Sequence, residues 1–156
     1  MTDIGSRVVS RWNRHKDSAI GRWFFSRGVG RFAPYTGTIG ARVKKLEPGR
    51  SLVTMRDRKA VRNHLNSVHA VALTNLIELT GSLSIIASLP AETRMIPIRL
   101  ETDFIKKGRG LMTAEASCFI PASNEKAELA ATVVIRDDTG DEVAHGRVTV
   151  VVGPSE

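Results

Sequence analysis

Residues 67–89 read SVHAVALTNLIELTGSLSIIASL, and this stretch decides the fold. Apolar residues occupy nearly every side of a helical wheel drawn over it, which predicts a helix enclosed by the rest of the protein. Asn66 or Ser67 is expected to accept hydrogen bonds from the free N–H groups of the first turn, and Pro90 is expected to end the run.

One carboxylate, Glu78, lies inside this apolar stretch. An enclosed carboxylate needs a partner, a raised pKa or a chemical role. Thr74, Asn75, Gly81 and Ser82 lie three or four residues from Glu78, so they are expected on the same helix face. This narrow polar face has room for a ligand atom or water, and glycine at position 81 would let a ligand approach the backbone.

The spacing between His69 and Glu78 has a structural consequence. Nine residues of helix are two and a half turns, which places the two side chains on opposite faces, about 13 Å apart along the axis. They cannot meet within one helix. If the helix start and Glu78 serve one site, they must come from two copies of the chain, so the spacing predicts a symmetric dimer.

The rest of the chain is rich in alternating patterns typical of β-strands. Pro97 falls within one of them and is expected at a sheet edge or bulge. One helix cannot cover both faces of a six-stranded sheet. We therefore predict an α+β fold whose antiparallel sheet curls around the helix, with an outer face or edge that needs a second copy. The expected strands are 38–46, 51–58, 94–106, 111–120, 128–136 and 142–152.

The N-terminal part differs in charge from the rest. Residues 1–62 carry fifteen Lys and Arg against four Asp and Glu, whereas residues 63–156 carry eight against twelve. We divide the chain into a basic amphipathic helical extension, 1–34, and a main domain, 35–156. The extension, with aromatics among its arginines, is interpreted as a cap packed on the domain or a dimer edge; a membrane-surface or nucleic-acid arm remains an alternative.

Composition excludes several classes of protein. A chain of 156 residues forms one domain, and the single cysteine, Cys118, excludes an internal disulfide and a cysteine-based zinc cluster. No secretory signal is recognised, and polar residues interrupt the apolar stretch, so a cytoplasmic protein without a transmembrane segment is expected. The sequence has no serine-hydrolase elbow, P-loop, dinucleotide fingerprint or metal-ligand set, so no cofactor or metal is expected.

The residues around the helix start resemble a known signature. Asn63-x-x-Asn66-x-x-His69-Ala70-Val71, with Glu78 nine residues after the histidine, resembles Asn-x-x-Gly-x-x-His-Gly-Gly followed by an acid at that spacing. That signature belongs to hotdog-fold acyl-CoA thioesterases of the phenylacetate-pathway type. Residues 33–40 and 62–64 are similar to a mostly uncharacterised thioesterase-like subgroup. The resemblance extends over about 35–152 and implies a hotdog fold: a curled antiparallel sheet around one long helix, here with an extra N-terminal helix.

The resemblance implies a metal-free thioester hydrolase with shared sites. Glu78 would be general base or nucleophile, and the backbone N–H of Ala70 would stabilise the oxyanion across a dimer interface. Asn63 would orient the water or carbonyl, His69 would position the loop or contact the thioester, and Ser82 would hydrogen-bond Glu78. Ala70, Val71 and Asn66 replace family glycines; Val71 narrows the approach, and Asn66 is expected to serve as the cap.

The resemblance also suggests where an acyl-CoA would bind. Lys106, Lys107 and Arg109, or the basic segment 56–62, would meet the phosphates. Asn66, Val71, Asn75 and Gly81 would face the substrate, and aliphatics such as Leu79 and Met112 would line the pocket for a fatty or aromatic acyl group. The expected assembly is a homodimer or a dimer of dimers.

Three other functions are alternatives. A non-catalytic acyl-CoA or fatty-acyl binding protein is favoured by the three replaced glycines. A hotdog dehydratase also uses an acid and a histidine, but no motif of it is present. A nucleic-acid module rests on basic charge alone, and we do not expect nucleic acid as a partner.

Overall fold

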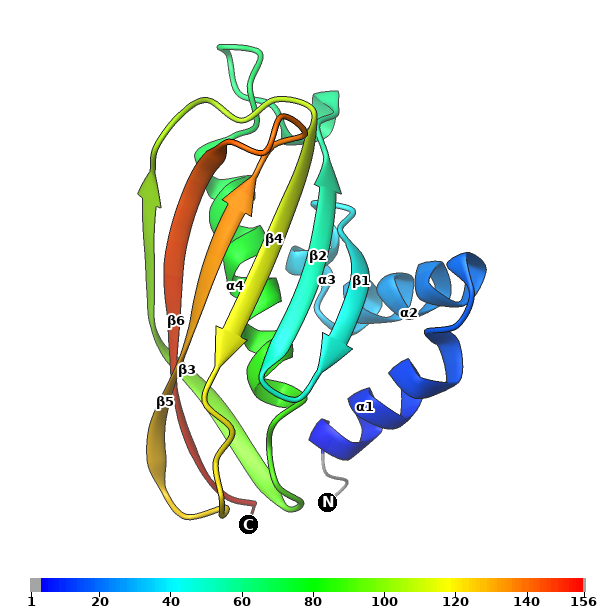
Figure 1. Cartoon of the computed structure of the whole chain (residues 1–156), viewed down its shortest axis with the longest axis vertical. Helices are drawn as coiled ribbons and strands as arrows, with labels where there is room; N and C mark the ends of the chain where they lie inside the picture. Colours follow the sequence, from blue (N-terminus) through cyan, green and yellow to red (C-terminus); the bar gives the residue numbers. More distant parts are fainter. Residues whose placement is uncertain (1–3, 156) are drawn as a thin grey trace.

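The computed structural model describes residues 4–155 as one curled sheet wrapped around one long helix, with a group of helices beside it (Figure 1). The predicted α+β architecture is confirmed. The central helix, α4, spans Ala70–Ile86 and packs mainly against four strands of the sheet. Its interior side chains, such as Leu76 and Ile77, are fully buried. None of the described helices is long and apolar enough to cross a membrane.

The helix is shorter at both ends than the apolar stretch that predicts it. His69 is its N-cap, and the Nδ1 atom of His69 accepts a hydrogen bond of 3.0 Å from the Val71 N–H. The expectation of Asn66 or Ser67 as cap is therefore wrong, because the Ser67 hydroxyl is hydrogen-bonded to Asn63. At the other end the helix stops at Ile86, four residues before Pro90.

All six expected strands form, and they pair antiparallel in the order β1-β2-β4-β5-β6-β3. Alternation predicts them because one face of each strand packs on α4. Pro97 sits in edge strand β3 next to a register shift, as predicted. The strands are β1 Arg42–Glu47, β2 Arg50–Arg56, β3 Thr93–Phe104, β4 Leu111–Cys118, β5 Ala127–Arg136 and β6 Glu142–Pro154, with a 3₁₀ turn over Lys59–Val61.

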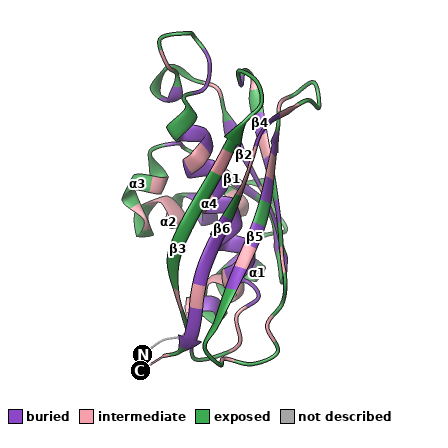
Figure 2. Cartoon of the chain, turned by 90° about the vertical axis from the view of Figure 1, so that its left-hand side faces the viewer, coloured by how far each residue is buried: buried purple, intermediate pink, exposed green. Residues whose placement is uncertain are grey.

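Strand β3 is an unusual edge. It pairs with β6 on one side, and most of its length is exposed (Figure 2). Ile96, Ile98 and Leu100 are 55%, 52% and 42% exposed. A long apolar edge strand offers unpaired backbone groups to another chain.

The N-terminal helices α1 (Ile4–His15), α2 (Ala19–Phe32) and α3 (Pro34–Gly37) lie on the β1 side of the molecule (Figure 1). The Ser18 hydroxyl caps α2 by accepting from the Gly21 N–H at 2.9 Å. Trp12 and Phe25 are buried and meet edge-to-face with 5.1 Å between ring centroids, so part of the extension packs on the core. Other aromatics of α2, Phe24 and Phe32, stay exposed.

Candidate functional site

Glu78 lies near the middle of α4 and faces a groove between α4 and the N-terminal helices. The groove has a volume of about 810 Å³, and α1 places Arg7, Arg11 and Arg14 along it. Glu78 is half-buried, and within residues 4–155 its one hydrogen-bond partner is the Ser82 hydroxyl, which donates to Oε1 at 3.1 Å. Apolar side chains in the groove wall include Val8, Phe25, Val29, Leu83, Ile86 and Met95.

The electrostatic state of Glu78 follows from this position. Burial raises the pKa of the carboxyl above its ordinary value, and the hydrogen bond from Ser82 opposes the rise only in part. A carboxyl whose pKa is moved toward neutrality is suited to accept and return a proton.

The raised pKa of Glu78 predicts a pH-dependent effect on stability. Below the ordinary carboxyl pKa of 4.5, the folded and unfolded chains both hold this proton and Glu78 adds no pH dependence. As the pH rises past that value, the unfolded chain ionises first, so the folded chain loses stability until its own carboxyl has ionised. We therefore expect Glu78→Gln to resist urea better than wild type at about pH 7, with the difference vanishing near about pH 4. Urea titrations followed by circular dichroism measure this, and an equal difference at both pH values would contradict the raised pKa.

The start of α4 holds a second set of site residues. Because His69 Nδ1 accepts from Val71, the N–H of Val71 is occupied, whereas the N–H of Ala70 has no partner among the described residues. Ala70 is the first residue of the helix, where free N–H groups and the helix dipole favour negative charge. This geometry suits an oxyanion donor.

His69 and Glu78 do not meet in one chain. His69 and Val71 line a smaller groove of about 180 Å³ with Arg62 and Asn75, whereas Glu78 lines the larger one. The buried Asn75 points toward the first helices, where its Nδ2 donates to the Tyr35 carbonyl at 3.4 Å. The separation expected from the nine-residue spacing is thus present in the structure.

The loop before α4 is held by Asn63. Its Oδ1 accepts from the N–H groups of Leu65 and Ser67 at 2.9 and 3.2 Å, so this side chain shapes the loop. Asn66 has a φ of 53°, a left-handed conformation that favours glycine and tolerates asparagine. This explains why asparagine stands where the similar signature has glycine, and it corrects the expectation that Asn66 caps the helix.

Gly81 faces the sheet and not the groove. A Cβ added to Gly81 would lie 2.6 Å from Cγ2 of Val148 and 3.3 Å from Cγ2 of Val133. The close approach expected at this glycine is therefore made by strands β5 and β6, which corrects its assignment to the substrate. Met112 is likewise fully buried in the core and does not line the Glu78 groove, whereas Leu79 does.

The basic turn between β3 and β4 is partly occupied by internal contacts. Lys106 Nζ lies 2.7 Å from carboxylate oxygens of both Asp137 and Asp141, and these hydrogen bonds raise its pKa. Arg109 Nε donates to the Asn66 carbonyl at 3.3 Å, and Lys107 is exposed. Lys106 is thus already paired with carboxylates, and its assignment to a ligand phosphate stays a prediction.

Sequence reasoning missed the wall that α1 and α2 add to the Glu78 groove. Val8, Phe25 and Val29 supply apolar surface opposite α4. Their spacing on amphipathic helices indicates a buried face, but the sequence alone does not say what that face covers. Among the described residues, no three His, Cys, Asp or Glu side chains gather to hold a metal ion.

Comparisons with known proteins agree with the fold. A crystal structure of a structural-genomics protein whose name states no function is 29% identical, with a TM-score of 0.80, covering 97% of this chain and 99% of that one. A Pseudomonas aeruginosa protein named a probable thioesterase is 23% identical, with a TM-score of 0.73, covering 83% and 93%. A Haemophilus influenzae thioesterase is 15% identical, with a TM-score of 0.69, covering 82% and 90%.

No curated protein matches the chain. The model of a family described as a domain of unknown function, DUF4442, matches residues 21–152. The match takes in α2, α3, the central helix and the sheet nearly to its last residue. The chain therefore belongs to the DUF4442 family, and it has the hotdog fold of thioesterase-family proteins.

Proposed function

We propose that this protein is a thioesterase that hydrolyses the thioester of a fatty or aromatic acyl-CoA, with Glu78 as the reacting carboxylate. The observation that carries the proposal is the half-buried Glu78, whose pKa is raised, in a largely apolar groove of about 810 Å³. Grooves of this size hold small ligands. Glu78, the one charged residue of α4, lines this groove. The thioesterases among the structural relatives support the class of reaction.

The reaction needs a base, an oxyanion site and a path for the proton. Glu78 would remove a proton from water as the water oxygen attacks the thioester carbonyl. The negative charge on the carbonyl oxygen would be stabilised by the Ala70 N–H. When the C–S bond breaks, the proton held by Glu78 passes to the thiolate. In the nucleophilic variant, Glu78 attacks first, releases the thiol and forms an anhydride, which water then hydrolyses.

The complete site would be formed by two protomers. Glu78 and the start of α4 line separate grooves within one chain, so a second copy must bring its own Ala70 and His69 to Glu78. The exposed apolar edge of β3 supports such pairing. In this arrangement Asn63 keeps the helix-start loop in shape, and His69 Nε2 is the ring atom left to face a thioester.

A non-catalytic acyl-binding protein is the second candidate. Val71 favours it, because its side chain is 52% exposed at the helix start where a thioester would approach, and its N–H is already taken by His69. Such a protein would keep the apolar groove and lose only turnover.

Thiol release from a panel of short, medium, long and aryl acyl-CoAs tests the proposal. We expect turnover on at least one class, with kcat/KM that depends on the acyl group. Tight, chain-length-dependent binding without thiol release would establish the acyl-binding candidate instead. If the protein showed no turnover and no acyl-dependent binding, both candidates would be contradicted.

A further inference from the structure

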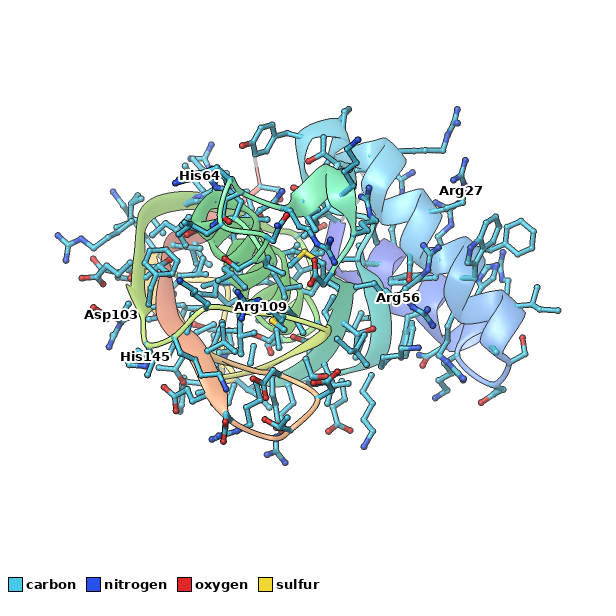
Figure 3. The ribbon with its side chains drawn as sticks, turned by 90° about the horizontal axis from the view of Figure 1, so that it is seen from above. Arg27, Arg56, His64, Asp103, Arg109 and His145 are labelled. Atoms are coloured by element: carbon cyan, nitrogen blue, oxygen red, sulfur yellow. The ribbon has the colours of Figure 1, made fainter. Side chains whose placement is uncertain are left out.

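A second large groove, of about 900 Å³, lies between α2, α3, β1 and β2. Seven of its side chains are basic and come from segments far apart in the sequence, whereas no Asp or Glu among the described residues lines it. They are Arg22, Arg27 and Arg31 of α2, Arg42 and Lys44 of β1, and Arg56 and Arg58 at the end of β2. We call this surface the cationic groove. Figure 3 shows Arg27 and Arg56 on the α2 side of the molecule, away from Asp103 and His145.

The charges of the cationic groove are not neutralised within residues 4–155. Some basic side chains elsewhere do have carboxylate partners: Arg62 pairs with Asp57 at 2.7 Å, and Lys106 pairs with two aspartates. No carboxylate lies within ion-pair distance of the seven groove cations in the described part of the chain. Arg58 donates to the Thr38 carbonyl at 2.7 Å, which fixes the side chain without cancelling its charge. Like charges gathered this way repel one another, and an anion with several charges would relieve the repulsion.

The shape and lining of the groove favour a small ligand. Its volume falls in the range of small-molecule sites, about 300–1,000 Å³. Trp23 lies in its wall, and the guanidinium carbons of Arg27 and Arg42 lie 5.3 and 5.7 Å from the centre of its ring. A flat aromatic side chain flanked by guanidinium groups suits an aromatic base attached to phosphates, because bases stack on aromatic side chains and arginine binds phosphate bidentately.

The cationic groove adjoins the Glu78 groove. Val29, Thr36 and Leu79 belong to the walls of both, and Leu79 follows Glu78 in the chain. A ligand with an anionic end and an acyl end could therefore place the two ends in neighbouring grooves.

From these observations we infer that the cationic groove binds the phosphorylated nucleotide end of coenzyme A. That the ligand is coenzyme A rests on the proposed thioesterase function, whereas the preference for a polyanion rests on the unpaired charges of the groove. Arg42 and Arg56 approach from two different strands and bind phosphate oxygens, and Trp23 offers its ring to the base. We favour this groove over the turn at 106–109, because Lys106 of that turn is paired with aspartates.

Calorimetry with the full-length protein tests the inference, using coenzyme A, adenosine 3′,5′-bisphosphate and inorganic phosphate as probes. We expect both nucleotides to bind, more weakly as salt rises, and the Arg42→Gln/Arg56→Gln double variant to raise Kd by about tenfold or more. Lys45→Gln is the matched control, since Lys45 is an exposed cation of β1 outside the groove. Its Kd should stay within about twofold of wild type. Circular dichroism establishes that each variant is folded.

Several results would overturn the inference. These are an unchanged Kd in the double variant, a loss of binding in Lys107→Gln instead, or inorganic phosphate binding as tightly as coenzyme A. Binding to anionic phosphatidylserine vesicles without binding to either nucleotide would assign the basic surface to a membrane and also overturn it.

Kinetics separate this inference from the proposed function. The double variant should raise KM for acyl-CoA and leave hydrolysis of the matching acyl-pantetheine unchanged, because acyl-pantetheine lacks the nucleotide. If the nucleotides bind and the double variant weakens that binding, but no thioester is hydrolysed, the thioesterase function is refuted and the groove assignment stands. If turnover depends on Glu78 while the double variant changes neither Kd nor KM, the groove assignment is refuted and the thioesterase function stands.

Discussion

Glu78→Gln is expected to lower thiol release from the best acyl-CoA substrate by at least about a hundredfold. The amide keeps the size of the side chain and can still accept a hydrogen bond from Ser82, but it can neither take a proton from water nor attack a carbonyl. Because burial raises the pKa of Glu78, the same change should stabilise the folded chain at neutral pH. Loss of activity together with gain of stability cannot be explained by unfolding.

The matched control for this prediction is Glu115→Gln. Glu115 is an exposed carboxylate of β4, and its partner Arg50 lies 3.5 Å away on β2. Neither residue lines the Glu78 groove. Its turnover should stay within about twofold of wild type, since surface ion pairs contribute little. Turnover that is the same in wild type and Glu78→Gln would refute the assignment of the reacting carboxylate and leave the fold unaffected.

Gly81→Val is expected to lower the free energy of unfolding by roughly 3 kcal/mol. A Cβ at Gly81 would lie 2.6 Å from a methyl carbon of Val148, and that valine is fully buried on β6 and has few rotamers. Valine adds two more carbons in the same space. Gly81→Ala should destabilise by a smaller amount, about 1–2 kcal/mol, because alanine's better helix propensity offsets part of the clash.

Gly28→Ala is the matched control for Gly81. Gly28 is also helical, but the nearest atom to an added Cβ is Nη1 of Arg11 at 3.8 Å, so alanine fits without strain. It should raise the free energy of unfolding by about 0.5–1 kcal/mol. Urea denaturation of the three variants measures these effects. A stable Gly81→Val protein would show that the helix does not touch the sheet at this position.

The fold was predictable from the sequence because its two strongest signals are local. An apolar run that surrounds the helical wheel at 67–89 indicates an enclosed helix, and alternation in the later segments indicates strands that pack one face on it. Pro97 could be placed at an edge or bulge because proline cannot donate to a ladder. Glu78 could be singled out because burying a carboxylate in an apolar helix costs free energy, so its presence there indicates a function.

The details that were missed depend on tertiary contacts. Gly81 and Ser82 follow Glu78 by three and four residues, so the sequence places both on its side of the helix. The position of the sheet relative to α4 decides that Gly81 packs on Val148 while Ser82 reaches the groove. The pairing of Lys106 joins residues 35 positions apart. His69 caps the helix because its Nδ1 atom accepts from the N–H of Val71. The general preference for Asn or Ser at helix N-caps does not predict this contact.

The cationic groove could be anticipated only in part. The excess of basic residues in 1–62 is plain in the sequence. Which of these residues meet depends on how α2 lies against β1 and β2, and that is set by contacts such as the Ser26 hydroxyl accepting from the Val43 N–H at 2.9 Å. Charge counts indicate that an anionic partner is favoured, and the fold is needed to show which basic side chains gather on one surface.

Mixing two inactive variants tests the shared site most directly. Ala70→Pro removes the proposed oxyanion donor with little structural effect, because proline suits the first position of a helix and the ψ of His69, 140°, suits a residue before proline. Ala70→Pro and Glu78→Gln should each be nearly inactive. When the two variants are unfolded and refolded together in equal amounts, about one site in four has both groups intact. A site shared between two chains therefore predicts about a quarter of wild-type turnover. Turnover no higher than the average of the two separate variants would contradict a site formed by Glu78 of one chain and Ala70 of another.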